Sequence, residues 1–269
     1  MNEADHATES GAPPVLYAMD GHVVTITYNR PDALNAVNGA LRETLNAAWN
    51  RFYDDPEAWV AILTGAGTKA FCAGADLKDG AGAVGTWPGT FWEIPTINSF
   101  ESGQEIWKPT IAAVNGHCIG YGLTAVAACD FVIAADHARF AYPEVKLGIP
   151  TIVGALRLPG KLRWDHAMEL LLIGDPISAE RAAEMGLVWR VVPGEQLADE
   201  AMTLARRLCQ GGPLAVRATK EMAARGAQLP WSDAVRMGET MRRVVAATDD
   251  ASEGLTAAAE RRRPNWTGT

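Results

Sequence analysis

The chain has 269 residues, of which 48% are hydrophobic and 21% are charged, and its formal net charge is −8. This length suits one large domain, or one domain with an appendage, and the composition is ordinary for a globular enzyme. The negative charge argues against a nucleic-acid partner, since nonspecific binding to phosphates needs a basic surface. An anionic cofactor could still bind at a local basic patch or at helix ends.

The cysteine pattern and the N-terminus indicate a cytoplasmic protein. The four cysteines form no C-x-x-C pair and no dense framework, which favours reduced thiols. Residues 1–12 are polar and acidic, so we predict a disordered tail and not a signal peptide. No apolar run has the length needed to cross a bilayer, and we therefore expect no membrane partner.

The first half of the chain alternates predicted strands with helices. Apolar residues at 15–19 and 23–28 flank an Asp-Gly turn and predict a β-hairpin. Helical spacing of apolar residues predicts an amphipathic helix over 38–54, and a buried strand follows at 59–63. The strand–helix–strand order begins again at residue 108, which predicts a spiral of ββα units.

The segment from 108 to 150 carries the strongest indication of a functional site. It predicts a buried strand at 111–114, a glycine turn and then an uncharged helix at 123–128, which must be buried because it has no polar face. The unpaired N–H groups of its first turn, with the positive end of the helix dipole, suit an anionic oxygen. Glu144 follows in a loop behind Pro143 and is the candidate catalytic carboxylate.

The pattern fails between residues 79 and 99, where Trp87, Phe91 and Trp92 cluster. This segment is either a surface excursion whose aromatic rings pack locally or a wall of an acyl pocket. We favour the pocket wall, because three large aromatic side chains in a loop need a partner surface.

Helices are predicted over most of the chain after residue 150. Pro159-Gly160 predicts a break, and a helix is expected at 164–173. Ser178 is a candidate N-cap of the next helix. Four further helices are expected, at 195–210, 213–226, 230–247 and 249–262. Each has one apolar face, so we expect these helices to pack on the core or on another subunit.

Four motifs, in order along the chain, resemble those of the crotonase superfamily, the enoyl-CoA hydratase/isomerase family. They are NRPDALNAVN at 29–38, AILTGAGTKAFCAGADLK at 61–78, AAVNGHCIGYG with ARFAYPEVKLGI between 112 and 149, and TDDASEGLTAAAERRRP at 248–264. The resemblance is specific because it joins several separate motifs and covers nearly the whole chain. It implies an α/β fold, a crotonase-like spiral of ββα units over residues 13–200, and a C-terminal helical trimerisation region over 201–269.

The resemblance also implies a substrate and its site. The substrate is an acyl-CoA thioester, the assembly is a homotrimer or a hexamer, and no separate cofactor is needed because coenzyme A is part of the substrate. By motif match, the backbone N–H groups of Ala75 and Tyr121 form the oxyanion hole, although the family usually has glycine where Tyr121 stands. The residues matched to the coenzyme A side are Arg30, Ala33, Leu34 and Lys78, with the two basic ones as phosphate partners.

Within the family, the number of catalytic glutamates differs between hydratases and isomerases. Hydratases carry two, and Glu144 matches the second, but Thr124 occupies the position of the first. A single carboxylate suffices to carry a proton from one carbon to another, as in the Δ3,Δ2-enoyl-CoA isomerases, so a double-bond shift is the leading expectation. A hydratase or dehydratase in which Thr124 positions water is the first alternative, and a family member that binds acyl-CoA without turnover is the second.

Other site patterns are weaker. Gly120-x-Gly122 between a strand and a helix imitates a dinucleotide fingerprint, which would indicate an NAD-dependent oxidoreductase. His117 as a base is a further alternative, and we expect it instead to be a buried histidine with satisfied hydrogen bonds. No His/Cys/Asp spacing indicates a metal site.

Overall fold

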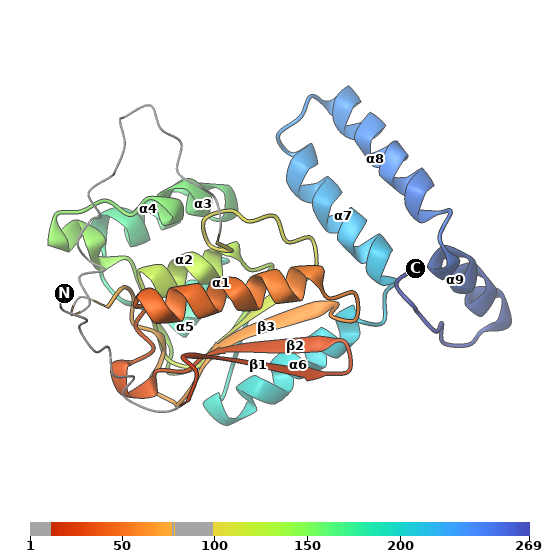
Figure 1. Cartoon of the computed structure of the whole chain (residues 1–269). Helices are drawn as coiled ribbons and strands as arrows, with labels where there is room; N and C mark the ends of the chain where they lie inside the picture. Colours follow the sequence, from red (N-terminus) through yellow and green to blue (C-terminus); the bar gives the residue numbers. More distant parts are fainter. Residues whose placement is uncertain (1–11, 77, 79–98) are drawn as a thin grey trace, which may run out of the picture.

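The computed structural model describes residues 12–76, 78 and 99–269, and it contains two mixed sheets (Figure 1). The larger sheet has the strand order β1-β2-β3-β5-β7-β10. Its strands are β1 (Val15–Asp20), β2 (Val23–Tyr28), β3 (Val60–Gly65), β5 (Thr110–Val114), β7 (Phe131–Ala135) and β10 (Arg190–Val192). The antiparallel pair β1–β2 confirms the predicted hairpin, and the remaining neighbours pair in parallel.

The smaller sheet has the strand order β4-β6-β8-β9. Its strands are β4 (Ala70–Cys72), β6 (His117–Ile119), β8 (Arg139–Ala141) and β9 (Ile177–Ser178). The chain adds a strand to each sheet in turn, β3 then β4, β5 then β6, and β7 then β8, which is the expected spiral. We did not predict β4 and β6, because three residues are too few to show a strand period.

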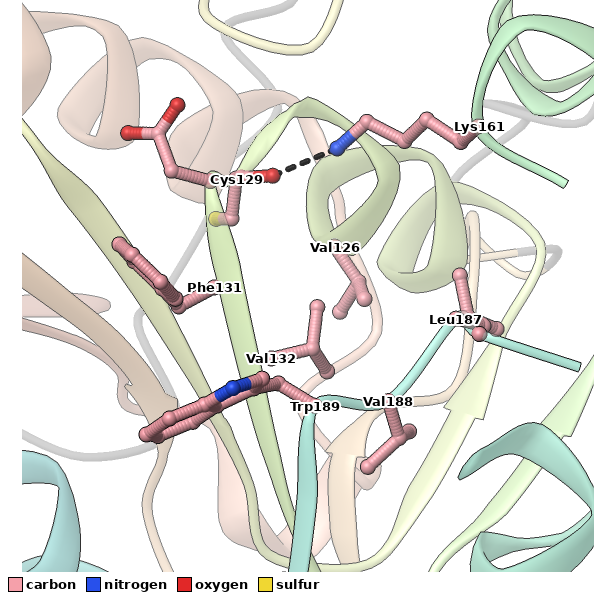
Figure 2. Close-up of a pocket in the computed structure, with 10 residues that line it drawn as sticks. Val126, Cys129, Phe131, Val132, Lys161, Leu187, Val188 and Trp189 are labelled. Atoms are coloured by element: carbon pink, nitrogen blue, oxygen red, sulfur yellow. Dashed lines mark hydrogen bonds between the residues drawn. The ribbon is translucent and has the colours of Figure 1, made fainter. Parts of the chain in front are cut away.

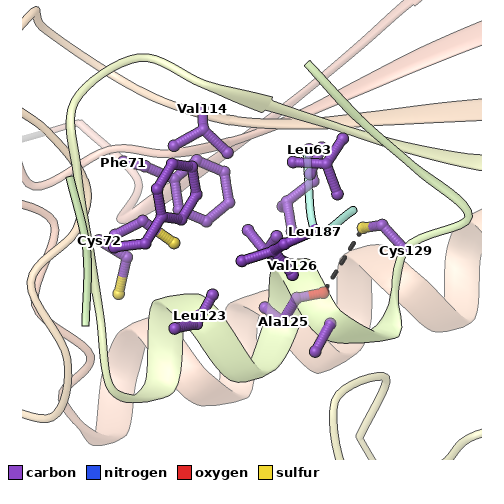
Figure 3. Close-up of a cluster of buried hydrophobic side chains, with 14 of the residues drawn as sticks. Leu63, Phe71, Cys72, Val114, Leu123, Ala125, Val126, Cys129 and Leu187 are labelled. Carbon is purple, nitrogen blue, oxygen red and sulfur yellow. Dashed lines mark hydrogen bonds between the residues drawn. The ribbon is translucent and has the colours of Figure 1, made fainter. Parts of the chain in front are cut away.

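The core lies on both faces of the larger sheet, as the alternation of β3 shows. Ala61 and Leu63 belong to the central cluster. Figure 3 shows Leu63 of this cluster packed with Phe71, Val114 and Leu123 between the strands and α2. Val60 and Ile62 point to the opposite face, where they join a second cluster with α6 (Leu197–Leu208). Because both faces are covered, these strands are continuous apolar runs, and each fully buried aliphatic side chain contributes roughly 1.5–3 kcal/mol.

Two helices flank the site region. α1 (Gly39–Asp54) confirms the predicted amphipathic helix, and Asn38 caps it by accepting a hydrogen bond from the Leu41 amide at 2.9 Å. α2 (Tyr121–Ala128) is buried from Gly122 to Ala127, as the absence of a polar face predicts. In Figure 1, α2 is seen behind α1. Its N-terminus follows the end of β6 by one residue, Gly120.

The predicted break at Pro159 is wrong, because α3 (Val153–Lys161) continues through it. Proline removes one donor, but the helix is held by Gly154 and Leu158, which are both buried. The helix expected at 164–173 is α4 (Trp164–Met168) followed by a π-turn, η4 (Glu169–Ile173). Ser178 caps α5 (Ala179–Glu184) through the Arg181 amide, as predicted.

The other C-terminal helices project from the body of the molecule (Figure 1). They are α7 (Pro213–Gly226), α8 (Trp231–Val245) and α9 (Asp249–Glu260), which confirms the remaining predicted helices. The boundary expected at residue 200 falls inside α6, which packs on the larger sheet. α8 buries no side chain within one chain, and self-association through this region stays a prediction. Among the described residues, no helix is long and apolar enough to cross a membrane.

Candidate active site

Two glycine turns bring Ala75 and Tyr121 together at one edge of the smaller sheet. β4 and β6 are parallel neighbours, and each ends in a turn with a left-handed glycine, Gly74 at φ +100° and Gly120 at φ +52°. A Cβ atom added to Gly120 would lie 3.9 Å from the Cα of Gly74. The residues that follow the two glycines, Ala75 and Tyr121, therefore start from adjacent points.

The backbone N–H groups of Ala75 and Tyr121 have no acceptor among the described residues. Ala75 is held by its neighbours, since the Val37 amide donates to Gly74 at 2.8 Å and the Asp76 amide donates to Val37 at 3.0 Å. Tyr121 is the first residue of α2, where the helix leaves its N–H groups unpaired. Two such donors on adjacent turns suit an oxygen that becomes negative during a reaction.

The Glu144 carboxylate lies against the backbone of Gly120. A Cβ atom added to Gly120 would meet Glu144 Oε1 at 2.8 Å. Glu144 belongs to the short 3₁₀ helix η3 (Pro143–Leu147), and its carbonyl accepts from the Ile149 amide at 3.1 Å. Its Oε2 atom is buried and has no hydrogen-bond partner in the described chain. Lys146, two residues further along η3, pairs with Asp175 and not with Glu144. Glu144 is thus placed to exchange a proton with a molecule bound beside it.

Thr124 lies one turn into α2, and only 8% of it is exposed. Its hydroxyl contacts the Gly120 carbonyl at 3.3 Å and the Tyr142 hydroxyl at 3.2 Å. Burial raises the pKa of Tyr142, while the hydrogen bond with Thr124 lowers it. The Thr124 hydroxyl is therefore already engaged by the protein, and positioning a water molecule would require it to exchange a partner.

The residues matched to coenzyme A gather beside Ala75. Arg30 Nη1 donates to the Ala36 carbonyl at 2.6 Å and to Asp76 Oδ2 at 2.9 Å, and this hydrogen bond lowers the pKa of Asp76. The Leu34 carbonyl accepts from the Ala73 amide at 3.1 Å, which ties the loop of Ala33 and Leu34 to the turn before Ala75. Lys78 is exposed, and its backbone amide donates to Asp76 Oδ1 at 3.2 Å. Trp87, Phe91 and Trp92, the expected acyl-pocket wall, lie outside the described residues.

The competing site patterns do not gain support. A Cβ atom at Gly122 would lie 2.7 Å from the Cys72 carbonyl, so this glycine serves close packing of α2 against β4, and Glu144 occupies the space at Gly120. The expectation of a buried His117 is wrong, because His117 is exposed at the start of β6, the strand before the Gly120 turn. No group of metal-ligating side chains occurs in the described ranges.

A separate cavity of about 460 Å³ lies at the other end of α2 (Figure 2). Its wall includes Val126, Val132 and Trp189, and the Lys161 amine donates to the Cys129 carbonyl at 2.6 Å beside it. This cavity is distinct from the turn that holds Tyr121, because α2 is eight residues long, or about 12 Å at 1.5 Å per residue.

Reasoning from the sequence missed two residues of this region. Tyr142 contacts Thr124 from the residue before η3. Glu101 is buried, and after burial itself the Glu101 carboxylate is the next cause that raises the pKa of Tyr121. Glu101 lies in no motif, and Tyr142 lies in the ARFAYPEVKLGI motif, in which only Glu144 was given a role. Only the vicinity of Tyr142 to Pro143-Glu144 in the sequence could have drawn attention to it.

Comparison with known proteins gives consistent matches over nearly the whole chain. The model of the family described as enoyl-CoA hydratase/isomerase matches residues 18–269. An (E)-benzylidenesuccinyl-CoA hydratase of Thauera aromatica is 37% identical over 95% of this chain and 99% of its own length. A carnitinyl-CoA dehydratase of Salmonella arizonae is 40% identical over 93% of this chain and 96% of its own length.

Solved structures agree with the fold. An enoyl-CoA hydratase of Mycobacterium marinum superimposes with a TM-score of 0.87 at 37% identity, covering 96% of this chain and 100% of that one. An enoyl-CoA hydratase of Mycobacterium tuberculosis does so with a TM-score of 0.86 at 39% identity, again over 96% and 100% of the two chains. The expected crotonase fold is therefore confirmed.

Proposed function

Because the chain belongs to the enoyl-CoA hydratase/isomerase family, we propose that it transfers a proton next to the carbonyl of an acyl-CoA thioester, with Glu144 as its single acid–base group. The observation that carries this proposal is the contact of Glu144 with Gly120, one residue before a proposed oxyanion donor. The thioester oxygen is bound by the N–H groups of Ala75 and Tyr121, and one such donor is worth about 3–4 kcal/mol to the transition state.

The leading reaction is a shift of a double bond. In a 3-enoyl-CoA, the Glu144 carboxylate takes a proton from the α-carbon, the C–H electron pair enters the conjugated system, and the thioester oxygen becomes a dienolate oxygen. The protonated Glu144 then returns the proton to the γ-carbon, and the product is a 2-enoyl-CoA. One carboxylate balances both steps, which agrees with a threonine at position 124.

Hydration or dehydration is the second candidate, and the relatives favour it, since those described above are named hydratases and dehydratases. In this reaction, Thr124 would hold the water and Glu144 would perform both proton transfers. A 2-enoyl-CoA and the matching 3-enoyl-CoA, assayed side by side, separate the two reactions.

An isotope experiment tests the shuttle itself. A 3-enoyl-CoA with deuterium on the α-carbon should yield product with deuterium on the γ-carbon in ordinary water, because one carboxylate carries the same nucleus. If the label is lost completely and a 3-hydroxyacyl-CoA forms rapidly from the 2-enoyl substrate, the reaction is hydration and not isomerisation. A gain of hydration in Thr124→Glu would support the argument that the second acid is missing.

A further inference from the structure

The Arg30 guanidinium group is engaged within the protein, beside the proposed oxyanion donor Ala75. Its Nη1 atom donates to the Ala36 carbonyl at 2.6 Å and to Asp76 Oδ2 at 2.9 Å. The Arg30 side chain is only 20% exposed, and the backbone amide of the same residue donates to Asn35 Oδ1 at 3.0 Å. The cation is therefore held both at its main chain and at its tip, and its place is set before any substrate binds.

A chain of hydrogen bonds connects this cation to the Ala75 amide. The first peptide group joins Ala36 and Val37, and its carbonyl accepts from Arg30. Its N–H group donates to the Gly74 carbonyl at 2.8 Å. The second peptide group joins Gly74 and Ala75, and its N–H group is the proposed donor to the thioester oxygen. Because a trans peptide points its carbonyl and its N–H group in opposite directions, the two peptide groups lie head to tail between Arg30 and that oxygen.

The bridge between Val37 and Ala75 holds this chain of hydrogen bonds in register. The two residues are paired in parallel, and Val37 is completely buried. The Val37 carbonyl also accepts from the Asp76 amide at 3.0 Å. The peptide groups before and after Ala75 are thus both tied to Val37, so the direction of the Ala75 N–H group follows from the position of Val37.

A cation at one end of such a chain strengthens the donor at the other end. A carbonyl that accepts from a charged group makes the N–H group of the same peptide a stronger donor, by about 10–30% per hydrogen bond. The other proposed donor has a comparable support. The Gly120 carbonyl accepts from the Thr124 amide at 3.0 Å, so the Tyr121 N–H group is backed by the peptide groups and the dipole of α2. Behind Ala75, the corresponding support is the Arg30 cation.

We propose that Arg30 is a positioning residue that acts through these two peptide groups and makes the Ala75 amide a stronger donor to the thioester oxygen. Asp76 has a different part, because its carboxylate holds the Arg30 guanidinium but is no link of the chain. This inference rests on the proposed function. It also gives Arg30 a role other than the phosphate contact that the family resemblance implies.

Infrared spectroscopy of a bound thioester measures the effect directly. The probe is butyryl-CoA with a ¹³C-labelled thioester carbonyl, which has no double bond to hydrate or shift. Its carbonyl band should move to lower frequency when it binds the unmodified protein, because two N–H groups polarise the bond. In Arg30→Met this displacement should shrink by about 10–30%, since the cation is gone. In Asp76→Asn the displacement should remain, because Arg30 can still donate to the Ala36 carbonyl.

Kinetics and binding separate this role from a contact with a phosphate. In Arg30→Met, kcat should fall roughly two- to eightfold, a fraction of the 10²–10³-fold loss that removing a donor causes, while KM stays within about threefold. The Kd for free coenzyme A, which has no thioester carbonyl, should not change. Arg206→Met is the matched control, because Arg206 also lies 2.9 Å from an aspartate, Asp20, on the exposed surface. This control should change neither the band nor kcat.

The outcomes distinguish the role of Arg30 from the proposed function. If the unmodified protein displaces the band and Arg30→Met displaces it equally, or if Asp76→Asn loses as much as Arg30→Met, the role of Arg30 is overturned and the oxyanion hole stands. A rise of about tenfold in the Kd for coenzyme A with an unchanged band would assign Arg30 to a phosphate instead. If the unmodified protein displaces the band no more than water does, the proposed function fails, and the role of Arg30 fails with it.

A double variant keeps the test decisive if Arg30→Met does not fold. Arg30→Met alone leaves the Asp76 carboxylate, whose side chain is 14% exposed, without its cation. Arg30→Met with Asp76→Asn removes both charges, and its band should show the same reduced displacement as Arg30→Met. A displacement in the double variant equal to that of Asp76→Asn would overturn the proposal.

Discussion

Glu144 Oε1 lies so close to the backbone of Gly120 that a Cβ atom added there would sit 2.8 Å from it. Gly120 also has φ +52°, which side-chain-bearing residues rarely adopt. The carboxylate and the turn that precedes the Tyr121 amide therefore form one unit. A methyl group at this position must displace either the carboxylate or the turn.

Gly120→Ala should therefore lower kcat/KM by at least about 100-fold, the effect of losing one oxyanion donor. Gly21→Ala is the control, since Gly21 has φ +56° in the β1–β2 hairpin and a Cβ atom there would meet nothing within 4 Å. Both variants should lose similar stability from backbone strain, but only Gly120→Ala should lose activity. Equal activity in the two variants would mean that the Glu144–Gly120 contact has no catalytic importance.

Thr124 and Tyr142 should behave as a coupled pair in stability. Thr124→Val leaves the Tyr142 hydroxyl buried without its partner and should lower the free energy of unfolding by about 1–3 kcal/mol. Adding Tyr142→Phe removes the unpaired group, so the double variant should recover part of that loss. Urea unfolding of the four proteins measures the coupling, and strictly additive losses would show that the contact is unimportant.

The same Thr124→Val variant separates the two candidate reactions. If Glu144 alone shifts the double bond, turnover of a 3-enoyl-CoA should stay within about threefold of the unmodified protein. A fall of about 100-fold in hydration of a 2-enoyl-CoA would instead identify Thr124 as the group that positions water.

The contribution of the Arg30–Asp76 pair to the free energy of unfolding should depend on pH. The pKa of Asp76 is lowered on folding, so its contribution is complete above the ordinary aspartate pKa and is lost as the pH falls through the folded value, below about 3.9. Asp76→Asn should therefore be less stable than the unmodified protein at pH 7, with the difference shrinking towards pH 2. Melting temperatures between pH 2 and pH 7 measure this.

Asp20→Asn provides the comparison. Arg206 and Asp20 are also 2.9 Å apart, but their side chains are 67% and 66% exposed, against 20% and 14% for Arg30 and Asp76. Water and salt screen exposed pairs, so this variant should change stability little at any pH. A pH-independent loss in Asp76→Asn would refute the assignment of the effect to the ion pair.

The thiols should be unreactive in the folded protein. Burial raises the pKa of Cys72 and Cys129 to about 12 and the pKa of Cys209 to about 11. Burial also raises the pKa of Cys118 well above its usual value. Since the thiolate is the reactive form, a disulfide reagent at pH 8 should titrate almost no thiol before unfolding and four afterwards. Rapid labelling of the native protein would show that the core opens.

Local sequence patterns predicted the helices and strands that carry the site, but they did not predict contacts between residues far apart in the sequence. α2 was predictable because the uncharged segment 123–128 follows the Gly120–Gly122 turn, although the helix begins two residues earlier, at Tyr121. Glu144 was predictable through its motif. Glu101 could not be singled out, because no motif or periodic pattern includes it, and only the fold shows that it is buried. The hydrogen bond between Thr124 and Tyr142 was not predicted either, because neither hydrophobic periodicity nor motif spacing indicates a contact between a helix and a later loop.

The role of Glu144 is tested most directly by Glu144→Gln, with turnover and binding measured on the same preparation. Glutamine keeps the size of the side chain but cannot take a proton, so kcat with a 3-enoyl-CoA should fall by about 10³-fold or more. The Kd for butyryl-CoA should stay within about threefold, because the two N–H groups remain, and Glu43→Gln on the exposed face of α1 should change neither quantity. Turnover by Glu144→Gln within tenfold of the unmodified protein would contradict the account.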